Sequence, residues 1–311
     1  MAVTAAMVKE LREMTGAGMM DCKKALGETN GDMEAAVDFL REKGLATAQK
    51  KAGRIAAEGI VVTKLTDDAK AAVVVEVNSE TDFVAKNEKF QNYVAEVAAQ
   101  ALTTSAADIE AFLAEPWAAD TSKTVNEALA AQIAVIGENM NIRRFEKVTC
   151  DNGIVVDYIH AGGKIGVLIA AETDNTGAEV VECLKNVAMQ IAAMNPQYLS
   201  SDDVSDEYKE REKAVLLAQA KNDPKNANKP DNIIEKMIIG RLNKELKEVC
   251  LTEQVYVKAE NKETVAKYVE SVAKAVGCNL KLKSFVRFET GEGLEKKEED
   301  FAAEVAAQMG N

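Results

Sequence analysis

The chain has 311 residues, of which 47% are apolar and 5% are aromatic. It is therefore long enough for two or three modules with cores built mostly from Ala, Val, Leu and Ile. The formal net charge of −13 argues against a general nucleic-acid-binding protein, which would carry a basic face. Five cysteines without a C-x-x-C pair argue against a disulfide framework or a zinc site, and they fit reduced thiols. There is neither an apolar run of about 18 residues nor a signal peptide, so we expect a cytoplasmic protein without membrane contact.

Residues 1–55 predict a compact three-helix domain, with Gly-containing breaks after each of the first two helices and Gly44 ending the third. A domain this small is marginally stable, and its surface often serves for docking. Met19 and Met20 are adjacent, so both cannot point into one small core. At least one should face solvent, where methionine suits an adaptable contact surface. Alternatively, Met20 only closes the second helix against the third. The basic, Ala-rich connector that follows, 46–58, reads as a solvated linker rather than an RNA-binding segment.

The core predicts an internal duplication. Residues 59–62 (Gly-Ile-Val-Val) recur at 153–156, and a second strand follows each copy at the same offset. Each strand pair leads to a Glu-Thr-Asp triplet, at 80–82 and 172–174, and then to a helix. We therefore expect an α+β protein with core subdomains over 56–150 and over 151–200 with 248–285.

The stretch 78–87 is the candidate functional element of this core. It lies between the β-branched strand 72–77 and a helical pattern, so Thr81 or Asp82 is placed to cap the helix. Phe83 then lies in the first turn at an exposed corner, where a large ring beside a carboxylate could act as a wedge against another protein. The alternative is that Phe83 staples the corner to the core. When the two triplets are aligned, Phe83 is matched by Asn175, so the repeated scaffold does not require a Phe here.

Two further segments of the core contain distinctive residues. Trp117 is expected to be a core anchor of the segment between the copies. His160 ends a strand before Gly162-Gly163-Lys164, which resembles a phosphate loop but lacks the G-x-x-x-x-G-K-[ST] spacing and is read as a hairpin turn.

Residues 201–247 predict a helical hairpin that protrudes and zips antiparallel, the alternative being two helices lying flat on the core. We expect the remaining residues, 286–311, to form a C-terminal module. Its acidic residues could make a disordered end, but Phe301 and Val305 lie on a helix face that would need a surface to pack on.

The sequence resembles the elongation factor Ts family, the bacterial nucleotide exchange factors for elongation factor Tu. The strongest likeness is at residues 81–87 (Thr-Asp-Phe-Val-Ala-Lys-Asn) and at 9–26; residues 137–145 and the C-terminal module also match. The resemblance implies a ubiquitin-associated-like N-terminal domain, a coiled-coil arm that can mediate a homodimer, and no cofactor.

The same resemblance implies the partner and its contacts. The partner would be elongation factor Tu, GDP-bound or nucleotide-free. Thr81, Asp82, Phe83 and Val84 would intrude beside its magnesium and phosphate site, and Leu11, Met19, Met20 and His160 would be docking contacts. The family pattern has Gly straight after the His, whereas this chain has Ala161.

No enzyme site emerges, because there is one His, no nucleophile elbow, no metal-ligand cluster and no phosphate loop. Two other classes stay open: a protein-binding adaptor or scaffold in which residues 82–83 are purely structural, and an enzyme whose site is assembled from scattered carboxylates.

Overall fold

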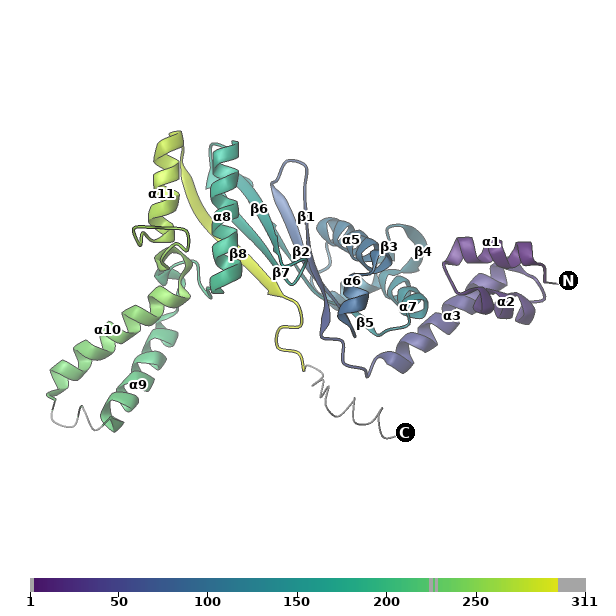
Figure 1. Cartoon of the computed structure of the whole chain (residues 1–311), viewed down its shortest axis with the longest axis horizontal. Coiled ribbons are helices and arrows are strands. Elements are labelled where there is room, and N and C mark those ends of the chain that lie inside the picture. Colours follow the sequence, from purple (N-terminus) through teal and green to yellow (C-terminus); the bar gives the residue numbers. More distant parts are fainter. Residues whose placement is uncertain (1–2, 224–225, 227–228, 296–311) are drawn as a thin grey trace.

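The computed structural model describes residues 3–223, 226 and 229–295. The predicted α+β class is confirmed: two three-stranded sheets lie at the centre, with helices on the outer side of each (Figure 1). The N-terminal helices extend from one end of this core and a helical hairpin projects from the other. In the part of the chain that is described, none of the helices has the length and apolar character needed to span a membrane.

The N-terminal domain consists of α1 (Ala5–Thr15), α2 (Met19–Glu28) and α3 (Met33–Lys51). The three helices share a small core of buried apolar side chains: Val8, Leu11, Cys22, Ala25, Leu26 and Ala36. The expectation that Gly44 ends the third helix is wrong, because α3 continues through the first half of the predicted connector. Gly44 is buried where α3 passes close to a core helix, and a Cβ there would lie 3.7 Å from the Ala130 carbonyl oxygen. This glycine serves close helix packing rather than helix termination.

The first sheet has the antiparallel order β1-β2-β5, formed by β1 (Glu58–Leu65), β2 (Ala71–Ser79) and β5 (Met140–Thr149). Its outer face is covered by α5 (Glu88–Thr103), α6 (Ile109–Ala114) and α7 (Val125–Ile136). A short hairpin of β3 (Pro116–Trp117) and β4 (Asp120–Thr124) connects the last two. Trp117 is buried in this core, as predicted.

The second sheet has the matching order β6-β7-β8, formed by β6 (Gly153–His160), β7 (Ile165–Thr173) and β8 (Leu280–Glu289). It is covered by α8 (Ala178–Met194) and α11 (Val265–Val276). Because β8 continues to Glu289, residues 286–289 belong to this sheet rather than to a separate C-terminal module. The predicted helix face with Phe301 and Val305 lies outside the described residues.

The internal duplication is larger than the sequence indicated. Besides the strand pairs, α7 and β5 recur as α11 and β8, each 140 residues further along the chain. Both helices begin at a threonine cap (Thr124, Thr264) and end at a glycine with positive φ (Gly137, Gly277). The core is thus two copies of one strand-strand-helix-helix-strand unit.

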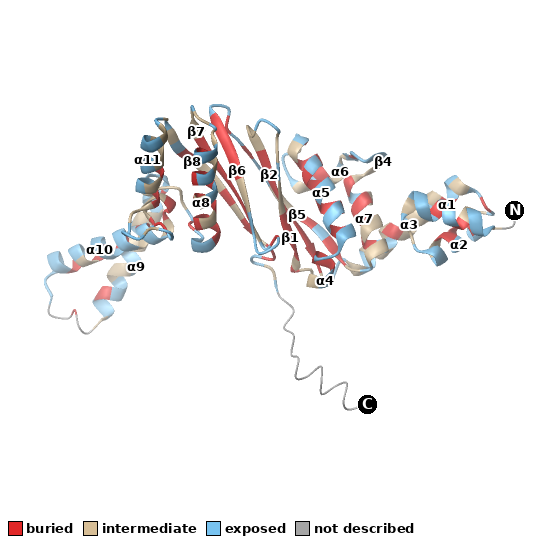
Figure 2. Ribbon diagram, turned by 45° about the horizontal axis from the view of Figure 1, so that its top comes forward, coloured by how far each residue is buried: buried red, intermediate tan, exposed pale blue. Residues whose placement is uncertain are grey.

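The two sheets pack face to face over a third layer of buried side chains. Figure 2 shows buried residues, in red, along the strands of both sheets. On β2, Val74 faces this layer, whereas its neighbours Val73 and Val75 face the helices. The sheets approach closely at Gly166 on β7, where a Cβ would lie 2.4 Å from Val61 Cγ1 and 3.3 Å from Val74 Cγ2. The absence of a side chain at Gly166 therefore permits this spacing of the sheets.

Gly166→Ala should lower the free energy of unfolding by about 1–3 kcal/mol, because an added methyl must push the packed sheets apart. Urea denaturation followed by circular dichroism measures this loss. Gly27→Ala, in α2 with open space around the glycine, is the control and should not destabilise the protein, because alanine favours helix. An unchanged unfolding midpoint for Gly166→Ala would contradict the close packing.

A buried carboxylate fastens one end of this layer. Glu76 on β2 is fully buried and accepts hydrogen bonds from Arg144 Nε at 2.6 Å, Arg143 Nη1 at 3.0 Å and Asn78 Nδ2 at 3.0 Å. The backbone amide of Gly291, just beyond β8, donates a fourth at 2.8 Å. Burial raises the pKa of the Glu76 carboxyl, but the hydrogen bonds outweigh it and the pKa lies below its ordinary value. The carboxylate thus joins the first sheet to the end of the second.

Glu76→Gln should lower the free energy of unfolding at pH 7 by about 3 kcal/mol, since it leaves two arginines facing a neutral group. A carboxyl whose pKa is lowered by folding stabilises the protein above the unfolded-state pKa of about 4.3, and this gain is lost as pH falls through the folded-state pKa. The difference between the two proteins in thermal unfolding should therefore shrink on acidification. A constant difference from pH 7 to pH 3 would argue against an ionised Glu76.

The projecting arm is formed by α9 (Asp206–Asn222) and α10 (Asp231–Val249), which zip antiparallel as predicted and do not lie flat on the core (Figure 1). Their contact is a stripe of apolar side chains at helical spacing: Leu216, Ala220, Ile234, Ile238, Leu242 and Leu246. Short 3-10 turns, η1 (Ser201–Asp203) and η3 (Leu251–Glu253), lie where the arm leaves the second subdomain.

Candidate partner-binding site

The corner between β2 and α5 presents a large apolar ring to solvent. Phe83 lies on the one-turn helix α4 (Asp82–Ala85), and 81% of its surface is exposed. It is the most exposed large hydrophobic residue of the described chain. The alternative in which Phe83 staples the corner to its own core is therefore wrong.

Thr81 caps α4, as the sequence predicted for Thr81 or Asp82. Its Oγ1 accepts a hydrogen bond from the Val84 amide at 3.3 Å and donates one to Glu138 Oε1 at 2.7 Å. The expected continuous helix is instead two helices, because the chain turns after α4 and Asn87 caps α5. The corner is thus a separate turn with its own cap.

Asp82 carries its charge beside a lysine. Lys86 Nζ donates to Asp82 Oδ2 at 2.7 Å, one helical turn away, and this bond lowers the pKa of the Asp82 carboxyl. The Lys164 ammonium, on the β6–β7 turn, adds to that lowering. The carboxylate is partly exposed and ionised next to Phe83.

Val84 is 8% exposed and packs into the first core together with Ala85. Its side chain anchors α4, so the prediction of Val84 as an intruding contact is revised. Of the four residues predicted for this contact, Asp82 and Phe83 present their side chains outward, while Thr81 and Val84 hold the turn.

The register of the strands corrects the alignment of the two copies. Gly59 pairs with Asn78 and Gly153 pairs with Glu172, so Ser79 is equivalent to Thr173 and Glu80 to Asp174. The prediction that Asn175 matches Phe83 was two residues out of register, because it followed the Glu-Thr-Asp triplets rather than the strands.

The helices after these strands reveal an insertion. Gln100 on α5 and Gln190 on α8 are both buried, and they accept the backbone N–H of Ala118 and of Val257, respectively, each in a segment ahead of the last helix of its copy. Measured from these glutamines, the first core residue is Phe90 in one copy and Val180 in the other. The first copy therefore has four more residues between its second strand and this helix, as many as α4 contains. Phe83 lies on a segment that the repeated fold does not need.

Hydrogen bonds from the α7–β5 loop, which the sequence did not indicate, brace this corner. Glu138, in the α7–β5 loop, accepts hydrogen bonds from the Thr81 amide and hydroxyl, and Glu80 accepts one from the Asn139 amide. The motif at 137–145 contained Glu138 and Asn139, but nothing in its pattern indicated what they contact.

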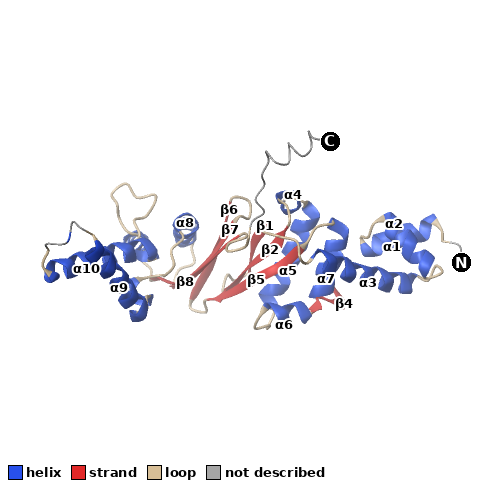
Figure 3. Ribbon diagram, turned by 90° about the horizontal axis from the view of Figure 1, so that it is seen from below, coloured by secondary structure: helices blue, strands red, loops and turns tan. Residues whose placement is uncertain are grey.

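The β6–β7 turn, which begins just after His160, lies near the α4 corner, because its Lys164 ammonium contributes to lowering the pKa of the Asp82 carboxyl. The β6–β7 turn packs on the start of β1, where the Val61 amide donates to the Gly163 carbonyl at 2.7 Å and Lys164 pairs with Glu58. Figure 3 shows α4 and this turn along one edge of the paired sheets. His160 is exposed there, and its Nδ1 is 3.0 Å from the Tyr158 hydroxyl. The structure brings together two predicted contacts that are 77 positions apart in the sequence.

The turn at His160 contains a backbone conformation that favours glycine. Ala161 has φ +49°, in the left-handed region that glycine adopts without a Cβ penalty. Ala161→Gly should therefore raise the free energy of unfolding by about 0.5–1 kcal/mol, the relief of backbone strain exceeding the entropy that glycine adds to the unfolded chain. Thermal unfolding measures this, with Ala69→Gly at another positive φ (+54°) as a parallel case. A lower midpoint would show that the turn is unstrained.

The N-terminal domain carries two exposed methionines. Met19 is 59% and Met20 is 73% exposed at the start of α2, so Met20 does not close α2 against α3. Leu11 is fully buried in the domain core. The prediction of Leu11 as a docking contact is revised to a residue that holds the helices together.

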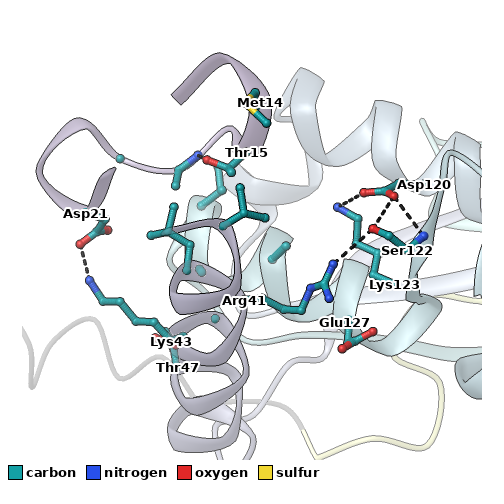
Figure 4. A pocket seen from close by; sticks show the side chains of 18 residues that line it. Met14, Thr15, Asp21, Arg41, Lys43, Thr47, Asp120, Ser122, Lys123 and Glu127 are labelled. Atoms are coloured by element: carbon teal, nitrogen blue, oxygen red, sulfur yellow. Dashed lines mark hydrogen bonds and ion pairs between the residues drawn. The ribbon is translucent and has the colours of Figure 1, made fainter. Parts of the chain in front are cut away.

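A cleft of about 420 Å³ separates this domain from the core, between α3 and α7 with β4 (Figure 4). Its charged side chains pair locally: Lys43 with Asp21, and Lys123 with Asp120 at 3.0 Å. Arg41 reaches across it to Ser122 Oγ at 3.2 Å. The cleft is a joint between two parts of the molecule rather than a set of unpaired binding groups.

Within the described residues, no three His, Cys, Asp or Glu side chains are grouped to hold a metal ion. The candidate site is instead a set of exposed side chains on separate elements: Phe83 on α4, His160 at the β6–β7 turn, and Met19 and Met20 on α2. Such an arrangement is typical of proteins that act by binding another protein.

Comparison with known proteins gives the family. The family model described as Elongation factor TS matches residues 80–292. Elongation factor Ts of Clostridioides difficile is 56% identical over 307 residues, and that of Clostridium novyi is 54% identical over 307, with 99% of both chains covered in each case. That of Trichlorobacter lovleyi is 55% identical over 314 residues, covering all of this chain and 99% of its own. The chain belongs to the elongation factor Ts family, as its motifs predicted.

Proposed function

We propose that this chain is a guanine nucleotide exchange factor that binds elongation factor Tu–GDP and promotes GDP release during translation elongation. The observation that carries the proposal is Phe83: a ring 81% exposed, on a four-residue insertion, in a capped and braced turn. Membership in the elongation factor Ts family supports the choice of partner. The chain would act by binding and would catalyse no chemical step itself.

The mechanism follows from thermodynamic linkage. A protein that binds the nucleotide-free partner more tightly than the GDP-bound one must weaken GDP binding by the same factor. The binding energy of the docking surfaces would thus be used to stabilise a partner conformation with a disturbed nucleotide site.

The Phe83 corner would create that disturbance. A rigid ring entering between packed elements of the partner's G domain would shift the groups that position its magnesium ion, because packed interiors do not deform continuously. The Asp82 carboxylate would add negative charge beside the magnesium and phosphate site. Loss of the metal would remove stabilisation from the diphosphate, and GDP would leave.

The remaining contacts would hold the partner in place. Met19 and Met20 would dock the N-terminal domain on the G domain, His160 would make a contact beside the corner, and the arm of α9 and α10 would touch the partner or mediate a homodimer. These contacts would supply affinity, whereas the corner supplies the exchange activity. An adaptor that uses the same docking surfaces without exchange activity is the competing function.

Phe83→Ala should slow the maximal rate of stimulated GDP release by about 10- to 100-fold, the equivalent of about 1.4–2.7 kcal/mol, because it removes a large apolar side chain from the wedge. The concentration for half-maximal stimulation should change less than about threefold. Stopped-flow release of fluorescent GDP from elongation factor Tu measures both quantities.

Asn175→Ala, at the corresponding corner of the second copy, is the control and should leave both quantities unchanged. If the unmodified chain leaves GDP release at its spontaneous rate, the adaptor function is correct instead. If Phe83→Ala weakens binding and rate equally, Phe83 is a docking residue and not the wedge.

A further inference from the structure

The direction of the Phe83 ring depends on a turn that has little stability of its own. α4 has four residues, far fewer than an isolated helix needs to persist in water. With 81% of its surface exposed, Phe83 has few contacts that could fix its position. The orientation of the ring is therefore set by whatever holds the backbone of α4.

Glu138 is the main polar contact from outside this segment. Its Oε2 accepts a hydrogen bond from the Thr81 amide at 3.0 Å, and its Oε1 accepts one from the Thr81 hydroxyl at 2.7 Å. The same hydroxyl accepts the Val84 amide. A single carboxylate thus fixes both the backbone and the side chain of the residue that caps α4.

Comparison with the second copy shows that the contact between Glu138 and Thr81 is not part of the repeated fold. Glu80 accepts the Asn139 amide in the first copy, and its equivalent Asp174 accepts the Asn279 amide at 2.9 Å in the second. That bond belongs to the scaffold, because both copies have it. The position of Glu138 is occupied by Cys278 in the second copy, where the inserted turn is absent. The carboxylate of Glu138 therefore accompanies the inserted turn.

We propose that Glu138 is a positioning residue for the Phe83 wedge, holding α4 through Thr81 in the orientation that enters the partner. The inference deepens the proposed exchange function and rests on it. Without the carboxylate, the fold and the docking surfaces remain, but α4 samples other orientations. A partner must then select the competent fraction, which lowers the rate of the exchange step more than it lowers binding.

The first test is amide hydrogen exchange of the full chain without a partner. In Glu138→Ala, peptides covering residues 79–87 should exchange at least about tenfold faster, because two hydrogen bonds to a charged group are lost. Peptides from the second copy should be unchanged. Unchanged exchange of residues 79–87 would overturn the proposal whatever the partner does.

The second test is stimulated release of fluorescent GDP from elongation factor Tu. Glu138→Ala should lower the maximal rate about tenfold and move the half-saturating concentration less than about threefold. Glu138→Gln keeps one acceptor oxygen and should restore part of the rate. If Glu138 acts through Phe83, adding Glu138→Ala to Phe83→Ala should cause no further loss of rate.

Asp174→Ala is the matched control. It removes two hydrogen bonds, from the amide and side chain of Asn279, between the equivalent segments of the second copy. It should leave the rate of GDP release unchanged; an equal loss would mean that Glu138 acts only through general stability and would overturn the proposal. Additive losses in the double variant would overturn it as well. If the unmodified chain does not accelerate GDP release, the exchange function fails, while hydrogen exchange still decides whether Glu138 holds the corner.

Discussion

The face-to-face packing of the two sheets is the constraint on which the rest of this molecule depends. Gly166 permits a spacing at which a methyl group would clash with Val61, and Glu76 fastens the end of the layer to the chain beyond β8. This packing places the β6–β7 turn on the start of β1. As a result, α4 and the β6–β7 turn, which belong to different copies of the fold, lie along the same edge of the protein.

The edge of the first copy that carries α4 differs locally from the equivalent edge of the second copy. Both copies keep the scaffold: the strand order, the glycine-terminated helix before the third strand and the clasp that Glu80 and Asp174 each make. Among the described residues, only the first copy carries α4. The first copy has the carboxylate of Glu138 where the second has Cys278. Such a comparison within one chain separates residues that build the fold from residues added to it.

The arrangement of the modules fits the proposed function, in which the protein binds a partner and distorts its nucleotide site. The N-terminal helices and the arm extend in opposite directions from a rigid double sheet, with α4 between them (Figure 2). In the proposed exchange function, widely spaced contacts would supply binding energy, and a stiff corner would convert part of that energy into distortion of the partner. The cap by Thr81 and the brace by Glu138 give the corner this stiffness.

The sequence alone determined the α+β class, the three helices, the antiparallel arm and the strand pairs, since these follow from periodicity, capping residues and local motifs. It singled out residues 81–87 through their family resemblance, and their role in partner binding stays a prediction. It placed Gly44 as a helix end and matched Phe83 to Asn175, because local patterns do not record which helix packs on a glycine or how strands pair. Tertiary structure decided that Phe83 is exposed while Leu11 and Val84 are buried. It also brought Glu138 to Thr81 across 57 positions, a contact between distant segments that only the packing of the sheet and helices creates.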